Sequence, residues 1–282
     1  MLGRYTKRMR MPYRSLGRTP LKVSALGLCP QDLGVLSAGE TCADALMSVA
    51  LDAGVNLFET HAGPIAEERL GRFLRGRRNQ VVLSIRARGL EEGTAVEIER
   101  SLSASLRRMQ TDWIDIMHLH GPLFDERRAA AWLDVLVAAK RAGKIRAIAW
   151  SDGGFALGSL PSDPRIDVLQ ARLSSRHPAL IREAVHCAVD RGIGVLARFS
   201  GRSAPPGPSL PEPAAIRRPE LWLRHAADLP GVASIVVRAS RPAELERCLR
   251  WISRGRLSPE VLAELEQGPG LPDSLKPQAR VA

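Results

Sequence analysis

The sequence predicts one α/β domain folded as a (β/α)8 TIM barrel, and three observations support this. The length of 282 residues suits a single barrel. Short runs rich in Val and Ile alternate with longer amphipathic stretches, as parallel strands alternate with crossover helices. Apolar residues form 45% of the chain but aromatic residues only 4%, so the core must consist of Leu, Val, Ile and Ala, which fill barrel interiors.

Eight apolar runs are the predicted strands. In chain order they are Val23–Leu28, Val55–Glu59, Val81–Arg86, Trp113–His120, Ile145–Ser151, Ile166–Gln170, Gly194–Phe199 and Ala233–Arg238. Eight strands with a crossover after each close into a barrel more readily than they form an open sheet. Their carboxyl ends then meet at one mouth, which is where the active sites of such barrels lie.

Helix signals fill the stretches between these runs. Residues 94–109 are expected to form a helix because five apolar residues recur there at helical spacing: Val96, Ile98, Leu102, Leu106 and Met109. Gly54, Gly143 and Gly192 each follow a predicted helix and precede a strand, as C-cap glycines do.

The chain divides into a barrel and two flanking segments. We expect a basic N-terminal extension over residues 1–10, the barrel over 11–256, and a C-terminal helix and tail over 257–282. Within the barrel, residues 200–214 carry five prolines, so they can form neither a helix nor a central strand. This segment is expected to be a loop above the mouth, after the seventh strand.

Composition restricts the partners of the protein. The net charge is +11, but acidic residues alternate with the basic ones on the same predicted helices, which indicates a solvated Arg-rich surface and no nucleic-acid partner. No window approaches the ~20 apolar residues of a membrane span, so no membrane partner is expected. The four cysteines lack metal-ligand spacing, and no secretory signal precedes them, which favours a reducing cytoplasm. The oligomeric state stays open.

Several motifs follow one another in a familiar order between Met11 and Leu249. They are Tyr13–Thr19, Leu26–Leu28, Asp52–Phe58, Glu67–Gly71, Ser105–Asp112, Leu119–Pro122, Gly143–Arg146 and Ser240–Pro242. In order and spacing the chain resembles the aldo/keto reductase family. The resemblance implies a (β/α)8 barrel that binds extended NADP(H) and reduces carbonyls with a Tyr acid, a Lys, an Asp and a His.

The catalytic set implied by this resemblance is incomplete. His120 matches the His of the family, whereas Arg86 stands for the Lys and Glu59 for the Asp. The Tyr is missing from residues 60–65, and the only tyrosines, Tyr5 and Tyr13, precede the first predicted strand. A positioned proton donor contributes about 10²–10⁴-fold to such a reaction, so reduction by the inherited route should fail.

Only some of the positions that correspond to the cofactor site carry the residue that the family has there. Ser151 and Gln170 match residues that hold the nicotinamide amide, but the next residue is Asp152 where the family has Asn, and Arg198 replaces the Tyr that stacks on the ring. The resemblance places a phosphate site near Arg238, Ser240 and Arg241. NADP(H) binding and the absence of a cofactor both remain open.

The mouth therefore gathers cations. Arg86, Arg198 and Arg238 stand at strand ends, which predicts a small anionic ligand, although a simple ion pair with Glu59 is favoured for Arg86. His118 and His120, with Glu59 or His61, have the composition of a two-His, one-carboxylate metal site. We favour histidines that are held by hydrogen bonds over histidines that bind a metal, so no metal is expected.

Three functional hypotheses follow. The leading one is a repurposed barrel that binds a small anionic molecule and either performs non-redox acid/base chemistry through His120 and Glu59 or has lost catalysis. The second is an NADP(H)-dependent oxidoreductase in which His61 or His120 donates the proton. The third is a non-catalytic binding or scaffold protein, so whether the chain is an enzyme stays open.

Overall fold

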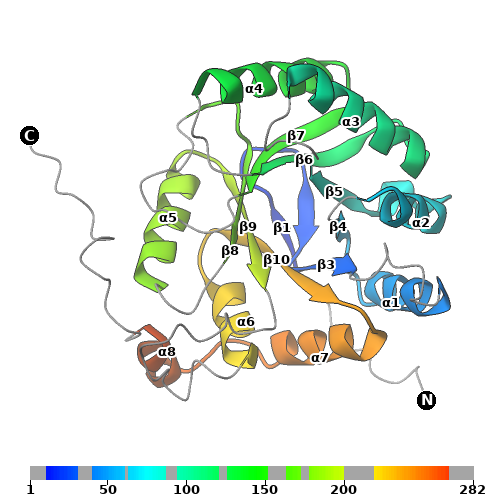
Figure 1. The fold of residues 1–282 in the computed structure, drawn as a ribbon. Coiled ribbons are helices and arrows are strands. Elements are labelled where there is room, and N and C mark those ends of the chain that lie inside the picture. The colour runs from blue at the N-terminus through cyan, green and yellow to red at the C-terminus, as the bar shows by residue number, and fades with distance from the viewer. Residues whose placement is uncertain are drawn as a thin grey trace, which may run out of the picture.

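The computed structural model describes residues 11–30, 40–60, 63–86, 94–120, 126–151, 163–172, 178–199 and 219–266. Within these ranges, parallel strands close into a barrel in the order β10, β3, β4, β5, β6, β7, β8, β9. Helices surround the barrel as an outer ring (Figure 1). This arrangement confirms the (β/α)8 barrel predicted from the sequence.

The element boundaries follow the predicted runs closely. The barrel strands are β3 (Leu26–Pro30), β4 (Leu57–Thr60), β5 (Val82–Arg86), β6 (Ile114–His120), β7 (Ile145–Ser151), β8 (Val168–Arg172), β9 (Gly194–Phe199) and β10 (Val232–Ala239). The helices are α1 (Glu40–Asp52), α2 (Pro64–Leu74), α3 (Ala95–Met109), α4 (Glu126–Arg141), α5 (Pro178–Asp190), α6 (Pro219–Asp228), α7 (Pro242–Ser253) and α8 (Pro259–Glu266), with a 3₁₀ turn at Arg78–Gln80.

Local signals explain how the helices begin and end. Thr94 caps α3 in a capping box with Glu97, as the start of the predicted helix requires. The three predicted C-cap glycines have φ angles of +81° at Gly54, +74° at Gly143 and +68° at Gly192. This left-handed conformation suits glycine, so these caps are confirmed.

The first predicted strand was wrong in one respect. The run from 23 to 28 contains two strands, because β2 (Lys22–Ser24) pairs with β1 (Tyr13–Ser15) in an antiparallel hairpin before β3 enters the barrel. The break falls at Ala25, whose backbone N–H donates to the Pro12 carbonyl at 2.8 Å. That contact comes from outside the run, so the apolar pattern of the run alone does not reveal the break.

The hairpin closes the amino-terminal end of the barrel. Leu16, Leu21 and Val23 pack in one buried cluster with the lower interior side chains of the barrel strands. Arg14 Nη1 donates to the carbonyl of Val232 at 2.8 Å, where β10 begins. A Cβ on Gly17, which has φ +54°, would meet the backbone of Gly194 at 2.2 Å. The hairpin therefore sits tightly against the strand starts.

Inward-facing positions change from apolar to polar along the strands. Because side chains alternate along a strand, residues two apart share the barrel interior. The inward pairs, apolar residue first, are Leu57 and Glu59, Ile116 and His118, Val168 and Gln170, and Leu196 and Arg198. The lower interior is thus an apolar core, and the polar layer above it forms the base of the mouth.

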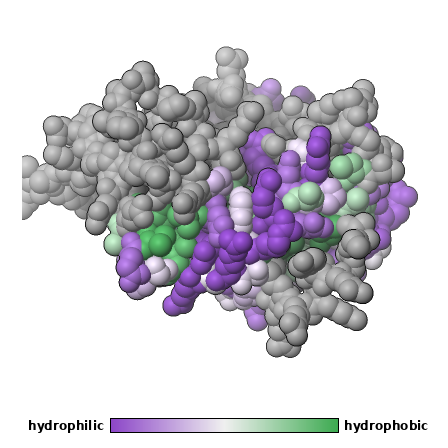
Figure 2. All heavy atoms as spheres, turned by 90° about the horizontal axis from the view of Figure 1, so that it is seen from below, coloured by the Kyte–Doolittle hydropathy of each residue, from purple (hydrophilic) through white to green (hydrophobic). Residues whose placement is uncertain are grey.

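Charged side chains are frequent among the exposed residues that the structure describes. Figure 2 shows mostly hydrophilic side chains on the face seen from below, with a smaller apolar area toward the side where Figure 1 places α6 and α8. A small cluster joins these two helices: Leu257 and Leu265 are buried, and Leu221, Trp222, Val261 and Leu262 pack against them. None of the described helices combines the length and the apolar character needed to cross a bilayer. The expected extension over 1–10, the loop over 200–214 and the tail after 266 lie outside the described residues.

We expect Gly71→Ala to lower the free energy of unfolding by about 2 kcal/mol, measured by urea denaturation. A Cβ at this position in α2 would lie 2.6 Å from the Met109 backbone of α3, and this overpacking outweighs the gain in helix propensity. The matched control is Gly63→Ala, whose Cβ would meet nothing within 4 Å and whose φ is 178°. The control should cost less than about 1 kcal/mol, and equal costs would refute the packing argument.

Candidate functional site

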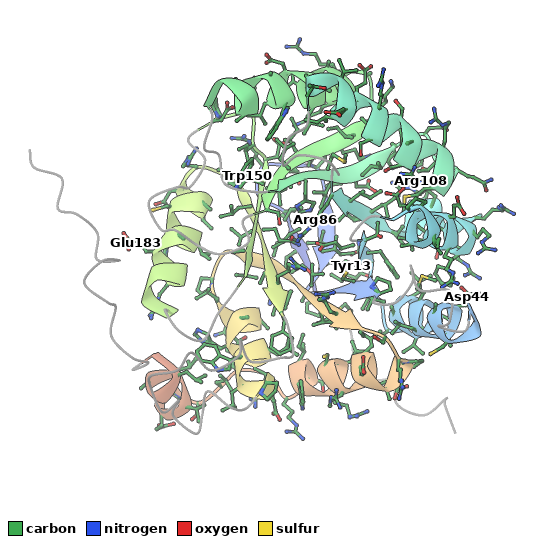
Figure 3. All side chains as sticks on the ribbon, viewed as in Figure 1. Tyr13, Asp44, Arg86, Arg108, Trp150 and Glu183 are labelled. Carbon is green, nitrogen blue, oxygen red and sulfur yellow. The ribbon has the colours of Figure 1, made fainter. Side chains whose placement is uncertain are left out.

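Gln170 is the centre of a hydrogen-bonded network at the base of the mouth. Its Nε2 donates to Glu59 Oε2. Its Oε1 accepts from Arg86 Nη2 at 2.8 Å and from Ser151 Oγ at 3.1 Å. Figure 3 shows Arg86 near the middle of the barrel. Four predicted site residues, from β4, β5, β7 and β8, are therefore brought into one network, which we call the floor.

Glu59 and Arg86 form the ion pair that the sequence predicts. Arg86 Nη2 lies 3.7 Å from Glu59 Oε1. The Glu59 side chain is fully buried, whereas the Arg86 side chain keeps 11% of its surface exposed. Gln170 and Ser151 are each only 1% exposed. Arg86 is therefore the floor residue that a ligand entering the mouth would contact first.

Two further arginines stand beside the floor on the next strands. In the strand register Arg238 of β10 is opposite Cys29 of β3, and Arg198 of β9 is opposite Val236 of β10. Burial and the positive charge of Arg86 lower the pKa of Arg198 to about 10, and Arg238 acts in the same direction. The guanidinium groups are thus close enough to repel one another, a situation that an anion would relieve.

Cys29 is a buried thiol within this group of charges. Burial, and then the carboxylate of Glu59, raise the pKa of Cys29 to about 12, although Arg198, Arg238 and Arg86 act against this rise. A thiol is nucleophilic only as the thiolate. The structure therefore supports the reading of Cys29 as a small buried residue.

A second buried pair lies beside the floor. Ser84 Oγ and His118 Nε2 are 2.7 Å apart, and both side chains are fully buried. In the register Ser84 is opposite Glu59, and His118 is opposite Arg86. Ser84 is not among the predicted site residues, although a polar residue at an inward position of an apolar strand is a usable signal. No group of three potential metal ligands occurs among the described residues.

The remaining predicted residues are separate from the floor. His120 is the last residue of β6 and is opposite Ser151 in the register, but its side chain, like His61 and Asp152, lies outside what the structure describes. The Ser240 backbone N–H donates to Glu244 Oε2 at 2.8 Å. Arg241 is the exposed N-cap residue of α7. Of the three residues assigned to a phosphate site, Ser240 and Arg241 thus stand between β10 and α7, and Arg238 lies within β10.

The comparisons with known proteins agree with this fold. Residues 37–194 match the model of the Aldo/keto reductase family. Over 148 residues the chain is 31% identical to L-galactose dehydrogenase of Arabidopsis thaliana. The match covers 48% of this chain and 46% of that protein. The match therefore spans about half the length of this curated relative.

Two solved structures are similar over most of the chain. The holo form of an aldo-keto reductase from Bacillus halodurans has a TM-score of 0.75 and 21% identity, covering 95% of this chain and 100% of that one. A crystal structure described as an aldo-keto reductase from Pseudomonas aeruginosa has a TM-score of 0.72 and 27% identity, covering 86% and 95%. Both have the same barrel.

We expect Cys29 to resist alkylation by iodoacetamide at pH 8 in the folded protein. With a pKa of about 12, only roughly 10⁻⁴ of this thiol is ionised at that pH. Cys187 is exposed on α5 and serves as the internal control that should be labelled. Peptide mass spectrometry after timed labelling measures both, and labelling of Cys29 as fast as Cys187 would contradict the burial argument.

We also expect Gln170→Leu to destabilise the fold by about 2–4 kcal/mol in urea denaturation. The change removes the donor to Glu59 and the acceptor for Arg86 and Ser151, so buried polar groups lose their partners. Gln80→Leu, at an exposed position of the 3₁₀ turn, provides the control and should change stability by less than about 0.5 kcal/mol.

Proposed function

The chain belongs to the aldo/keto reductase family, and from that premise we propose that its barrel has been repurposed to bind a small anionic molecule. The observation that carries the proposal is the charge of the mouth. Among the described side chains there, the guanidinium groups of Arg86, Arg198 and Arg238 accompany the carboxylate of Glu59. Arginine is the side chain best suited to hold carboxylate or phosphate groups.

The tyrosines of the chain support a departure from carbonyl reduction. The chain contains only Tyr5, outside the described residues, and Tyr13. Tyr13 lies in the hairpin that closes the opposite end of the barrel, and its hydroxyl donates to the Gly54 carbonyl at 2.7 Å. An alkoxide formed at the mouth would therefore lack a phenolic proton donor from the described strand ends.

Each residue has a distinct part in the proposal. Arg198 and Arg238 hold the anionic group, and the exposed part of Arg86 contacts it from below. Glu59 is buried, so it acts as a positioning residue that fixes the Arg86 guanidinium through the ion pair. His120, at the end of β6, is the acid/base that exchanges a proton with the ligand in the catalytic version of the proposal. In the other version the protein binds without reaction.

NADP(H)-dependent reduction with His61 or His120 as proton donor is the second candidate, favoured by membership in the family. The group that this reaction requires does not fit the floor well. Ser151 and Gln170, which match the residues that hold the nicotinamide amide, are hydrogen-bonded to each other, and Gln170 is also bound to Glu59 and Arg86. We therefore derive no catalytic step through this cofactor.

We also infer a reducing cytoplasm as the place of action. All four cysteines, Cys29, Cys42, Cys187 and Cys248, are free thiols. Such thiols persist where glutathione and thioredoxin keep them reduced. Blocking of thiols in freshly prepared cell extract, followed by mass spectrometry, would contradict this inference if it found disulfides in the native protein.

We expect Arg198→Ala and Arg238→Ala each to weaken the binding of inorganic phosphate by about 10–100-fold in isothermal titration calorimetry. Each change removes charge-assisted hydrogen bonds to the anion. Arg250→Ala removes the same charge from the exposed side of α7 and should leave the affinity within a factor of about two. Mass spectrometry of small molecules that co-purify with the wild type would then identify the natural anion.

Three results would redirect the assignment. Micromolar NADPH binding, with aldehyde-dependent NADPH oxidation that disappears in His120→Ala, would favour the oxidoreductase. Equal loss of phosphate binding in Arg250→Ala would show that the anion binds by general surface charge. Absence of binding for both phosphate and NADPH would favour the scaffold hypothesis.

A further inference from the structure

The floor connects opposite walls of the barrel. In the closed strand order three strands separate β4 from β8 in either direction, so Glu59 and Gln170 face each other across the interior. The Glu59 carboxylate nevertheless accepts a hydrogen bond from Gln170 Nε2 and pairs with Arg86 on the neighbouring strand. The side chains of Glu59 and Gln170 together thus bridge the interior.

We propose that Glu59 is a specificity-determining residue that closes the floor to a carboxamide and so selects an anionic ligand. This inference rests on the proposed function for the identity of the preferred ligand. Its structural part, the occupation of the Gln170 amide, stands on the hydrogen bonds of the floor alone.

The hydrogen bonds of Gln170 explain the exclusion. A carbonyl oxygen has two lone pairs, and Gln170 Oε1 uses them for Arg86 and Ser151. Gln170 Nε2 donates one of its two hydrogens to Glu59, and the Ser151 hydroxyl donates its single hydrogen to Gln170. The Gln170 oxygen is therefore fully used, and both Gln170 and Ser151 are buried. A neutral amide on a ligand would have to displace these buried partners to reach the Gln170 amide, and unsatisfied buried partners are costly.

The length of Glu59 is the critical feature. Aspartate carries its carboxylate one methylene closer to the backbone, about 1.5 Å less reach. In Glu59→Asp the carboxylate would therefore withdraw from Gln170 on the far wall while staying near Arg86 on the adjacent strand. The released Nε2 hydrogen would then be available to a ligand carbonyl.

The floor also favours an anion because its most exposed side chain is an arginine. Glu59, Gln170 and Ser151 are at most 1% exposed, while the Arg86 side chain is 11% exposed. A ligand that reaches the floor of the wild type therefore meets a guanidinium group and no available amide. A carboxylate or phosphate forms charge-assisted hydrogen bonds with this guanidinium, whereas a neutral carboxamide forms only a weaker hydrogen bond.

The test compares NADP⁺ with 2′-phospho-ADP-ribose, in which a hydroxyl replaces the positively charged nicotinamide ring. We expect wild-type protein to bind both with affinities within a factor of about two in isothermal titration calorimetry, because the buried Gln170 amide is already occupied. In Glu59→Asp, NADP⁺ should gain about tenfold over the nicotinamide-free molecule, which is the value of one new hydrogen bond. Glu59→Gln keeps the reach of the side chain and should show no gain.

Each outcome decides the inference. A wild-type preference for NADP⁺ above about tenfold, no gain in Glu59→Asp, or an equal gain in Glu59→Gln overturns it. If the thermal melting curve shows that Glu59→Asp does not fold, the ratio of the NADP⁺ and 2′-phospho-ADP-ribose affinities of the wild type decides alone. If the wild type binds neither molecule, the same ratio measured for Glu59→Asp decides. Inorganic phosphate binding tests the proposed function separately, because it depends on Arg198 and Arg238. If phosphate binds as expected while the Glu59 results do not, this inference alone has failed.

Discussion

The hydrogen bond between Glu59 and Gln170 is the interaction on which the organisation of the mouth depends. A buried carboxylate is tolerated only when it is paired and hydrogen-bonded. Gln170 and Arg86 supply those partners from two other strands, and Ser151 completes the environment of the amide. Because β4 and β8 lie on opposite sides of the closed barrel, satisfying this one carboxylate links its opposite walls.

The division of the interior into two layers makes this arrangement possible. The hairpin and the lower strand residues form an apolar layer, which provides stability without polar groups. The polar residues are confined to the next inward positions, close to the mouth. Charges there need to be satisfied by one another or by a ligand, which is why a single layer of the barrel carries both the stabilising network and the candidate binding site.

Much of the fold could be predicted from the sequence because its signals are local. Strand periodicity, the Thr94 cap and the C-cap glycines depend on residues close in the chain. The Glu59–Arg86 ion pair was also predictable, since neighbouring strand ends meet at the mouth. The role of Gln170 as a partner of Glu59 was not, because β4 and β8 face each other only in the closed barrel. The break at Ala25 was missed because the apolar run continues through it, and the contact of Ser84 with His118 depends on the register between β5 and β6.

The hairpin beneath the barrel has a kinetic consequence. Leu16 packs against Gly194, and Arg18 binds the carbonyl of Ile166, so the entrances between the strand starts are filled. A ligand can therefore reach the floor only from the carboxyl end of the strands, and it has to leave by the same route. A bound ligand then blocks its successor until it dissociates.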